Sequence, residues 1–130
     1  MSNILGIGTD IVDISRVKEL INKNKNFKKR IFSAKEITHC ESKTNKIASY
    51  AKRFAAKEAF AKALGTGFRK DLNFKDISVV NNKIGKPSFI INEKIKKIIK
   101  KKFKITIFNF FLSISDEKKY SIAFVILQKK

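Results

Sequence analysis

"LGIGTDIVDI", residues 5–14, is the stretch that decides how the chain is expected to fold. Its apolar residues, interrupted by Gly6, Gly8 and Asp10, predict a strand over residues 3–13. Successive side chains of a strand point to opposite faces, so these three residues share one face. Glycine weakens a strand, and two glycines beside a carboxylate indicate that something bulky approaches the backbone there. An aspartate that only caps or turns the chain near a strand end is the alternative interpretation.

Length and composition favour one globular domain spanning residues 1–130. The chain is 43% hydrophobic and contains one Pro and five Gly, a composition that can form a packed core. No apolar run approaches the roughly 18 residues needed to span a bilayer, and the N-terminus lacks the pattern of a signal peptide. The single cysteine, Cys40, cannot form an internal disulfide, which agrees with a reducing compartment. We therefore expect a cytoplasmic protein with no membrane partner.

The charge is strongly unbalanced, with 30 Lys and Arg against 11 Asp and Glu and a formal net charge of +19. Such a protein attracts nucleic acid, anionic membranes and acidic proteins alike, and a general bias toward lysine explains most of the excess equally well. A small basic nucleic-acid-binding protein is the strongest functional alternative, supported by this charge and by 12 phenylalanines. Many phenylalanines lie in apolar runs such as "FNFFL" and "IAFVI", however, where core packing is the simpler explanation.

The remaining pattern alternates helices and strands, which predicts an α+β fold with one long helix and short helices packed on a mainly antiparallel sheet. The expected helices span Ser15 to about Asn24, a segment beginning at Ala34 behind the capping box Ser33–Glu36, Asn45–Leu64, and residues 92–102. The expected strands are residues 77–80 and 86–91 around a turn at Asn81 and Asn82, residues 104–115, and residues 120–127 after a turn at residues 116–119. Asn is expected to supply left-handed backbone angles in the first of these turns.

A second informative stretch is "RFAAKEAFAKALGTG", residues 53–67, at the end of the long helix. Phe54, Glu58 and Lys62 are spaced by four, so they lie along one side of that helix. A solvated ion pair between Glu58 and Lys62 would explain their spacing without any chemistry. The many alanines would let the helix pack closely against a sheet, and the glycines at its end stop the helix.

Asp10 and Glu58 together offer two hard oxygen ligands of the kind that Mg²⁺ accepts beside water and substrate phosphate oxygens. Lys62 would then lie beside a phosphate. Two carboxylates that hold a metal completed by a pyrophosphate form a reasonable phosphoryl-transfer site, provided that the fold brings them together.

These two stretches, "GIGTDIVDISRV" (residues 6–17) and "RFAAKEAFAKALGTG", closely resemble the paired signature motifs of the holo-acyl-carrier-protein synthases. This family is the small bacterial type of 4′-phosphopantetheinyl transferase. The resemblance extends to "GKP" at residues 85–87, to "LSISDEKKYSIAFVIL" at residues 112–127 and to the overall length. It therefore covers nearly the whole chain.

The resemblance implies an α+β 4′-phosphopantetheinyl transferase-like fold that assembles as a homotrimer, with active sites at the subunit interfaces. Members use Mg²⁺ to move the 4′-phosphopantetheine group of coenzyme A to a serine of apo-acyl-carrier protein, and they release adenosine 3′,5′-bisphosphate. This reaction supports fatty acid biosynthesis. By motif position, Asp10 and Glu58 match the metal-binding carboxylates and Lys62 matches the lysine that contacts the phosphates. Glu58 is the best candidate to help deprotonate the serine, directly or through a metal-bound water.

Further binding residues follow from the same resemblance. Coenzyme A is expected to contact Arg53, Lys62, Gly65, Gly67, Gly85, Lys86 and Pro87, the last three in a loop near the nucleotide. The acidic carrier protein is expected to dock on the first helix, where Arg16 matches the motif arginine. The lysines that follow it, Lys18, Lys23, Lys25, Lys28 and Lys29, would steer an acidic helix by complementary charge.

One position departs from the family pattern. Members usually carry histidine after the serine-x-serine of the penultimate strand, whereas this chain has Asp116 there. A carboxylate cannot donate a hydrogen bond as histidine does and repels a nearby phosphate, so a transferase fold with impaired catalysis is a third interpretation. His39, the only histidine, and Cys40 next to it are interpreted as structural or incidental, because no further Cys or His could complete a metal cage.

Overall fold

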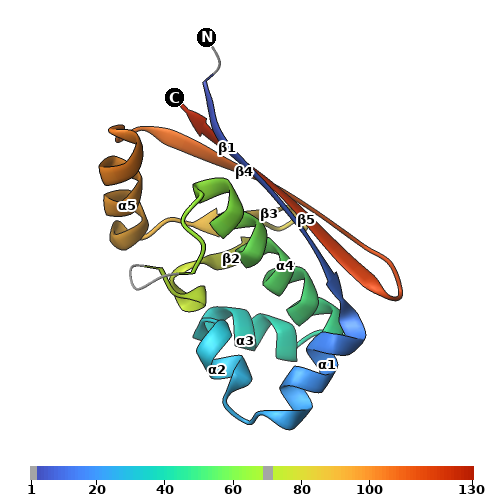
Figure 1. Cartoon of the computed structure of the whole chain (residues 1–130). Coiled ribbons are helices and arrows are strands. Elements are labelled where there is room, and N and C mark those ends of the chain that lie inside the picture. The colour runs from blue at the N-terminus through green and yellow to red at the C-terminus, as the bar shows by residue number, and fades with distance from the viewer. Residues whose placement is uncertain (1–2, 69–71) are drawn as a thin grey trace.

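The computed structural model describes residues 3–68 and 72–130, in which five strands and five α-helices pack as an α+β fold (Figure 1). In chain order the elements are β1 (Ile4–Asp13), α1 (Ile14–Lys23), α2 (Phe27–Ile31), α3 (Ala34–Glu41), α4 (Lys46–Leu64), the 3₁₀ turn η1 (Phe74–Asp76), β2 (Ser78–Asn81), β3 (Pro87–Ile90), α5 (Glu93–Phe103), β4 (Phe108–Asp116) and β5 (Tyr120–Lys129). The expected fold class is confirmed. None of the helices described is long and apolar enough to cross a membrane.

The main sheet has the order β1-β5-β4, and both of its strand pairs are antiparallel. Asp10 on β1 pairs with Ala123 on β5, which in turn pairs with Ile114 on β4. The β2-β3 hairpin forms a second sheet. The helices lie on one side of the main sheet, and none of the described residues forms a helix on its other face (Figure 1).

The long helix α4 packs directly on β1, and the two glycines of β1 make this close approach possible. A Cβ atom at Gly6 would lie 1.8 Å from the carbonyl oxygen of Ala63, and one at Gly8 would lie 1.8 Å from that of Ala59. The bulky group expected beside these glycines is therefore the backbone of α4. Ala55, Ala56 and Ala59 of α4 complete the contact, because their small side chains are fully buried in the core cluster that includes β5.

A buried ion pair joins α4 to α3 and to the segment that follows η1. Lys57 Nζ donates to Glu36 Oε1 at 2.7 Å and to the carbonyl oxygens of Phe74 and Ile77. Glu36 also accepts hydrogen bonds from the backbone N–H groups of Ser33 and Val79, so the expected capping box is present and does more than cap α3. Both charged groups are thus surrounded by partners, as burial of charge requires.

Three local expectations were wrong in detail. The helix α2 was not predicted, because five residues are too few to show a helical period. The strand expected from residue 104 begins at Phe108, since Lys104 adopts a left-handed conformation (φ 60°) that ends α5. In the β2-β3 turn the left-handed residue is Gly85 (φ 88°), and Asn82 instead accepts hydrogen bonds from the N–H groups of Ile84 and Lys86.

Candidate active site

Asp10, Glu58 and Lys62 come together in one pocket of about 300 Å³, which we call the carboxylate pocket. β1 supplies Asp10 from the face that packs on α4, and α4 supplies the other two from the side predicted by their spacing. The complete lining is Asp10, Ile11, Val12, Arg16, Val17, Leu20, Phe54, Glu58 and Lys62. The expected meeting of the two sequence motifs is therefore present in the fold.

Lys62 is partnered by Asp10 and not by Glu58. Its ammonium lies 3.0 Å from Asp10 Oδ1 and 2.9 Å from the carbonyl oxygen of Thr9. Among the described residues there is no ion pair between Glu58 and Lys62, so the simple helix pair considered from the sequence does not form. The cation instead joins α4 to β1 across the pocket.

The environment of Glu58 favours a cation or a proton. Burial raises the pKa of its carboxyl above the ordinary value of 4.5, the charge of Asp10 raises it further, and Lys62 opposes both effects. Two carboxylates that repel one another in a small pocket suit Mg²⁺, which accepts one or two carboxylates and completes its shell with water and phosphate oxygens. Asp10 and Glu58 are the two carboxylates that line this pocket, so they are the residues that could hold such an ion.

A second, larger space of about 700 Å³ lies at the other side of α4, and we call it the basic cavity. Arg53, Gly85 and Pro87, three of the residues expected to contact coenzyme A, line it, and Lys86 between them contributes its N–H to the turn. Its complete lining is His39, Lys43, Thr44, Asn45, Ala48, Ser49, Lys52, Arg53, Val79, Asn81, Asn82, Lys83, Gly85, Pro87, Ile114 and Asp116.

Arg53 is held firmly at the wall of the basic cavity. It is only 4% exposed, and its guanidinium donates to Ser49 Oγ at 3.3 Å and to Asn81 Oδ1 at 2.6 Å. Its Nε atom is buried with no protein partner. Asp116, at the end of β4, lies 3.8 Å from the ammonium of Lys52. The carboxylate at this position, where the resemblance led us to expect histidine, is therefore matched by a cation on α4.

The carboxylate pocket and the basic cavity open at opposite edges of the main sheet. β1 borders the first and β4 borders the second, and β5 runs between these strands with Ala123 fully buried beneath α4. Neighbouring strands lie about 4.8 Å apart, so the two edges are separated by about 10 Å and by the helix.

The two glycines after α4 have different surroundings. Gly65 (φ 78°) ends the helix as a left-handed cap, and a Cβ there would lie 2.5 Å from Lys102 Nζ, which donates to the carbonyl of Leu64. At Gly67 (φ 64°) no atom of the residues that the structure describes lies within 4 Å of a Cβ placed on it, apart from its chain neighbours. Helix termination accounts for Gly65, and Gly67 leaves room for a ligand.

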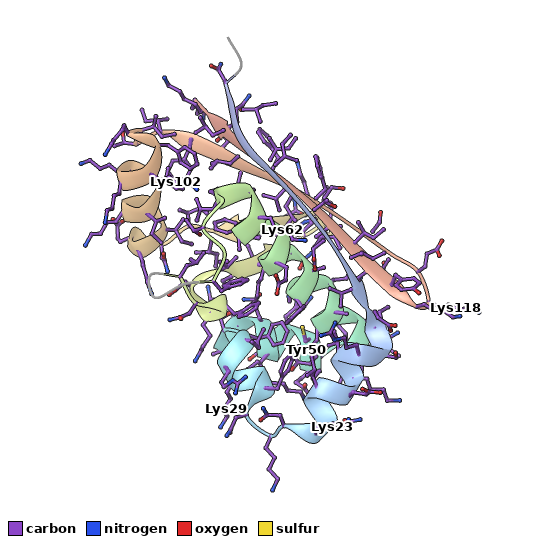
Figure 2. All side chains as sticks on the ribbon, in the orientation of Figure 1. Lys23, Lys29, Tyr50, Lys62, Lys102 and Lys118 are labelled. Carbon is purple, nitrogen blue, oxygen red and sulfur yellow. The ribbon has the colours of Figure 1, made fainter. Side chains whose placement is uncertain are left out.

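The basic residues expected to bind a carrier protein lie on α1 and just beyond it. Arg16, Lys18 and Lys23 are exposed, and Arg16 also borders the carboxylate pocket. Figure 2 shows Lys23 and Lys29 at the end of the molecule formed by α1 and α2. Lys28 differs from its neighbours, because it pairs with Glu41 at 2.8 Å and, together with Tyr50, lowers the pKa of that carboxyl to about 2.

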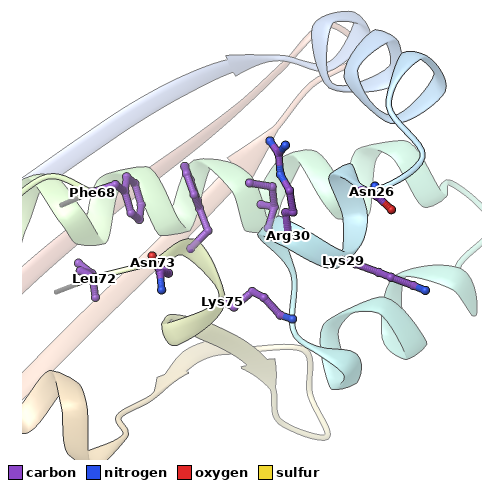
Figure 3. Close-up of a pocket in the computed structure, with 9 residues that line it drawn as sticks. Asn26, Lys29, Arg30, Phe68, Leu72, Asn73 and Lys75 are labelled. Atoms are coloured by element: carbon purple, nitrogen blue, oxygen red, sulfur yellow. The ribbon is translucent and has the colours of Figure 1, made fainter. Parts of the chain in front are cut away.

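A third cavity, of about 610 Å³, adjoins this basic end (Figure 3). Lys29, Arg30 and Lys75 form its polar part, while Phe68 stacks on Phe74 with ring centroids 3.7 Å apart. Its complete lining is Asn26, Lys29, Arg30, Ile31, Phe68, Leu72, Asn73, Phe74 and Lys75. This cavity could not be expected from the sequence pattern, because α2 was not predicted.

Sequence reasoning also missed residues of the basic cavity. Lys43, Lys52 and Asn81 line it, and His39, interpreted as structural, does so as well. The basic residues could not be distinguished from other surface lysines by pattern. Asn81 had a usable signal, since it lies directly before the turn that carries the "GKP" motif.

Comparisons with known proteins identify the family. The profile of the 4′-phosphopantetheinyl transferase superfamily matches residues 6–125. A holo-[acyl-carrier-protein] synthase from Pelagibacter ubique is 66% identical over 127 residues, which cover 98% of each chain. The crystal structure of the Neisseria meningitidis synthase has a TM-score of 0.87 and 38% identity, covering 97% of this chain and 99% of that one. A Bacillus anthracis synthase, solved in complex with CoA (3′,5′-ADP), has a TM-score of 0.80 and 34% identity over 98% of both chains.

None of these matches supports the nucleic-acid-binding alternative. They extend over nearly the full length, include both motifs and preserve the fold. The chain therefore belongs to the holo-[acyl-carrier-protein] synthase family of the 4′-phosphopantetheinyl transferase superfamily.

Proposed function

We propose that this chain, acting as one domain over residues 1–130, transfers 4′-phosphopantetheine from coenzyme A to a serine of apo-acyl-carrier protein. The observation that carries the proposal is the meeting of Asp10, Glu58 and Lys62 in one pocket. Family membership supplies the reaction, since its named relatives are holo-[acyl-carrier-protein] synthases. The cytoplasmic location expected from the sequence stays a prediction.

In the proposed reaction the serine hydroxyl attacks the phosphorus that carries the pantetheine arm. A new oxygen–phosphorus bond forms, the bond to the bridging pyrophosphate oxygen breaks, and adenosine 3′,5′-bisphosphate leaves. Glu58 accepts the hydroxyl proton, directly or through a water, and its raised pKa makes it a stronger base than an ordinary carboxylate. Lys62 offsets the negative charge that develops on the phosphate oxygens.

Asp10 and Glu58 are the residues that would hold Mg²⁺ in this proposal. Their charges repel one another in the carboxylate pocket, and a bound divalent cation relieves that repulsion. When bound, the ion polarises the phosphate oxygens. Lys62, which donates to Asp10 and to the carbonyl oxygen of Thr9, would contact a substrate phosphate beside these carboxylates.

We assign the nucleotide end of coenzyme A to the basic cavity. Arg53 lines it with an unpartnered Nε, and the loop of Gly85, Lys86 and Pro87 borders it. Gly65 and Gly67 would lie against the pantetheine side of the ligand, where Gly67 leaves open space. Lys43, Lys52 and Lys83 give the cavity the positive charge that phosphates require.

The separation of the carboxylate pocket from the basic cavity favours an active site shared between copies of the chain. One ligand that reaches both within a single copy must cross α4. The bare face of the main sheet offers the surface for assembly, since Ile7 and Ile11 on β1 and Ile122 and Phe124 on β5 are 39–61% exposed. A contiguous apolar face of this kind is typical of an interface. A homotrimer with interfacial sites is the assembly we propose.

The partner is proposed to dock on α1. Arg16, Lys18 and Lys23 present positive charge beside the mouth of the carboxylate pocket, and Lys29 and Arg30 extend this charge to the third cavity. An acidic carrier helix placed there would bring its serine toward Glu58. Complementary charge of this type mainly raises the association rate.

Intact-mass analysis tests the proposal directly. Apo-acyl-carrier protein incubated with this chain, coenzyme A and Mg²⁺ should gain the mass of one phosphopantetheine. The gain should disappear with a chelator and with Asp10→Ala, and it should persist in Glu93→Ala, which removes an exposed carboxylate on α5. A folded protein that binds nucleic acid but neither binds coenzyme A nor modifies the carrier would refute the proposal.

A further inference from the structure

His39 lies in the basic cavity although nothing in the sequence motifs leads to it. It comes from α3, the helix that precedes α4, and it is half-buried. Lys52 and Arg53 face the cavity from α4, and Asp116 faces it from β4. The only imidazole of the chain is thus placed among the cations that we assign to a phosphorylated nucleotide.

This position bears on the departure noted in the sequence. The family usually has a histidine where this chain has Asp116, and Asp116 is here engaged with Lys52 at 3.8 Å. The same cavity nevertheless contains an imidazole, contributed by a different element. His39 of α3 therefore supplies this cavity with the hydrogen-bond donor and acceptor of an imidazole, which Asp116 cannot provide.

The surroundings of His39 keep it neutral when the cavity holds no anion. Burial lowers the pKa of its imidazole, and the positive charges of Arg53, Lys43 and Lys52 lower it further. The other charged groups that border it are Lys83 and Asp116 in the basic cavity and Lys35 in an adjoining cavity. A neutral imidazole offers one donor and one acceptor, which suits the polar edge of a base or a ribose hydroxyl.

We propose that His39 is a binding residue for the nucleotide end of coenzyme A in the basic cavity. The inference rests on the proposed function, because it takes the same substrate and assigns a new contact to it. The residue is not part of either signature motif, and its role follows from its place in the lining of the cavity that Arg53 and Asp116 also line.

The single histidine makes the test unusually direct, since a protein without an affinity tag has one imidazole to observe. We would follow its Hε1 resonance by NMR while adding adenosine 3′,5′-bisphosphate, and titrate pH with and without this probe. Binding should move the resonance and raise the histidine pKa, because the phosphates neutralise the three neighbouring cations. Calorimetry on the same samples measures binding independently.

Kinetics provide the second measurement. His39→Ala should raise the KM for coenzyme A roughly threefold to tenfold and leave kcat unchanged, because one hydrogen bond to the bound substrate is lost. His39→Gln, which keeps a donor and an acceptor, should recover part of this loss, while Lys97→Ala at an exposed position of α5 should have no effect. A purely structural role would instead lower the melting temperature and leave KM unchanged.

The possible failures are distinguishable. If the bisphosphate binds by calorimetry and the histidine resonance and KM stay unchanged, the role of His39 is wrong and the proposed function stands. If the folded protein neither binds the bisphosphate nor modifies the carrier, both proposals fail together.

Discussion

Gly8 lies so close to Ala59 that a Cβ on the glycine would be 1.8 Å from the alanine carbonyl oxygen. This contact sets the distance between β1 and α4. It therefore also sets the distance between Asp10, two residues further along β1, and Glu58, the residue before Ala59. The fold and the candidate site depend on the same close approach.

Gly8→Ala should destabilise the protein by about 3 kcal/mol or more, because a methyl group has no space unless α4 moves away from the sheet. Chemical denaturation measures this change. Gly67→Ala is the matched control, because no described residue crowds a Cβ there and the substitution pays only for a left-handed angle, about 1 kcal/mol. Equal losses in the two variants would show that conformational freedom, and not close packing, explains Gly8.

Lys57→Met should cost about 3–5 kcal/mol of unfolding free energy, because Glu36 would remain charged in a fully buried site. The substitution also removes the hydrogen bonds that Lys57 donates to the carbonyl oxygens of Phe74 and Ile77. Lys96→Met removes the cation of an exposed pair with Glu93 and should cost less than about 0.5 kcal/mol. Denaturation of the two variants side by side compares them, and a similar small loss in both would contradict a structural role for the buried pair.

The sequence allowed much of the fold to be predicted, because its signals are local. Asn45 and Gly65 bound the long helix, the Ser33–Glu36 capping box starts α3, and alternation on β1 assigns Asp10 to the helix-facing side. The meeting of Asp10 with Glu58 was a consequence of that same packing. Motif resemblance added the chemistry, which spacing alone could not provide.

What could not be predicted depends on contacts between distant segments. The partner of Lys62 is Asp10, from a strand more than fifty residues earlier, and local spacing favoured Glu58 instead. The partners of Lys57 were likewise hidden, since a lysine in a motif gives no sign that it will be fully buried. His39 entered the basic cavity through the packing of α3, which no pattern in the sequence encodes.

Glu58→Gln should abolish transfer and yet stabilise the protein at pH 7 by about 0.5 kcal/mol, as is common for active-site charges. Because the folded-state pKa of Glu58 is raised, the folded protein binds this proton more tightly than the unfolded chain does. Lowering the pH from above the folded-state pKa of Glu58 to the ordinary value of 4.5 therefore stabilises the folded wild type. The difference in unfolding free energy between the wild type and Glu58→Gln should then vanish.

Denaturation curves between pH 4 and pH 8 would show this convergence. Glu93→Gln is the control of opposite sign, since Glu93 lies in the first turn of α5, where a negative charge is favourable, and its loss should slightly destabilise. If Glu58→Gln is less stable than the wild type at pH 7, burial and the charge of Asp10 do not destabilise the ionised Glu58 carboxylate.

Ile122→Lys should convert the proposed trimer to monomers, because the residue lies on the central strand of the bare sheet face and is 43% exposed in the single chain. Sedimentation velocity measures the change in mass, and circular dichroism should show an unchanged fold. Ser88→Lys, on an exposed position of β3, introduces the same charge away from that face. Dissociation by both substitutions, or by neither, would contradict assembly through this surface.

Reversing charge at Lys18 and Lys23 should weaken use of the carrier protein far more than use of coenzyme A. Both side chains are exposed on α1, away from the basic cavity, so the double Glu variant should raise the carrier KM about tenfold and leave that for coenzyme A unchanged. The control is the same double reversal at Lys97 and Lys101 on α5, which makes an equal change in net charge. The loss at α1 should shrink as salt is added, because exposed charges are screened within about 10 Å at 0.1 M. If the α5 variant loses carrier affinity to the same extent, the net charge of the protein, and not a docking site on α1, attracts the carrier.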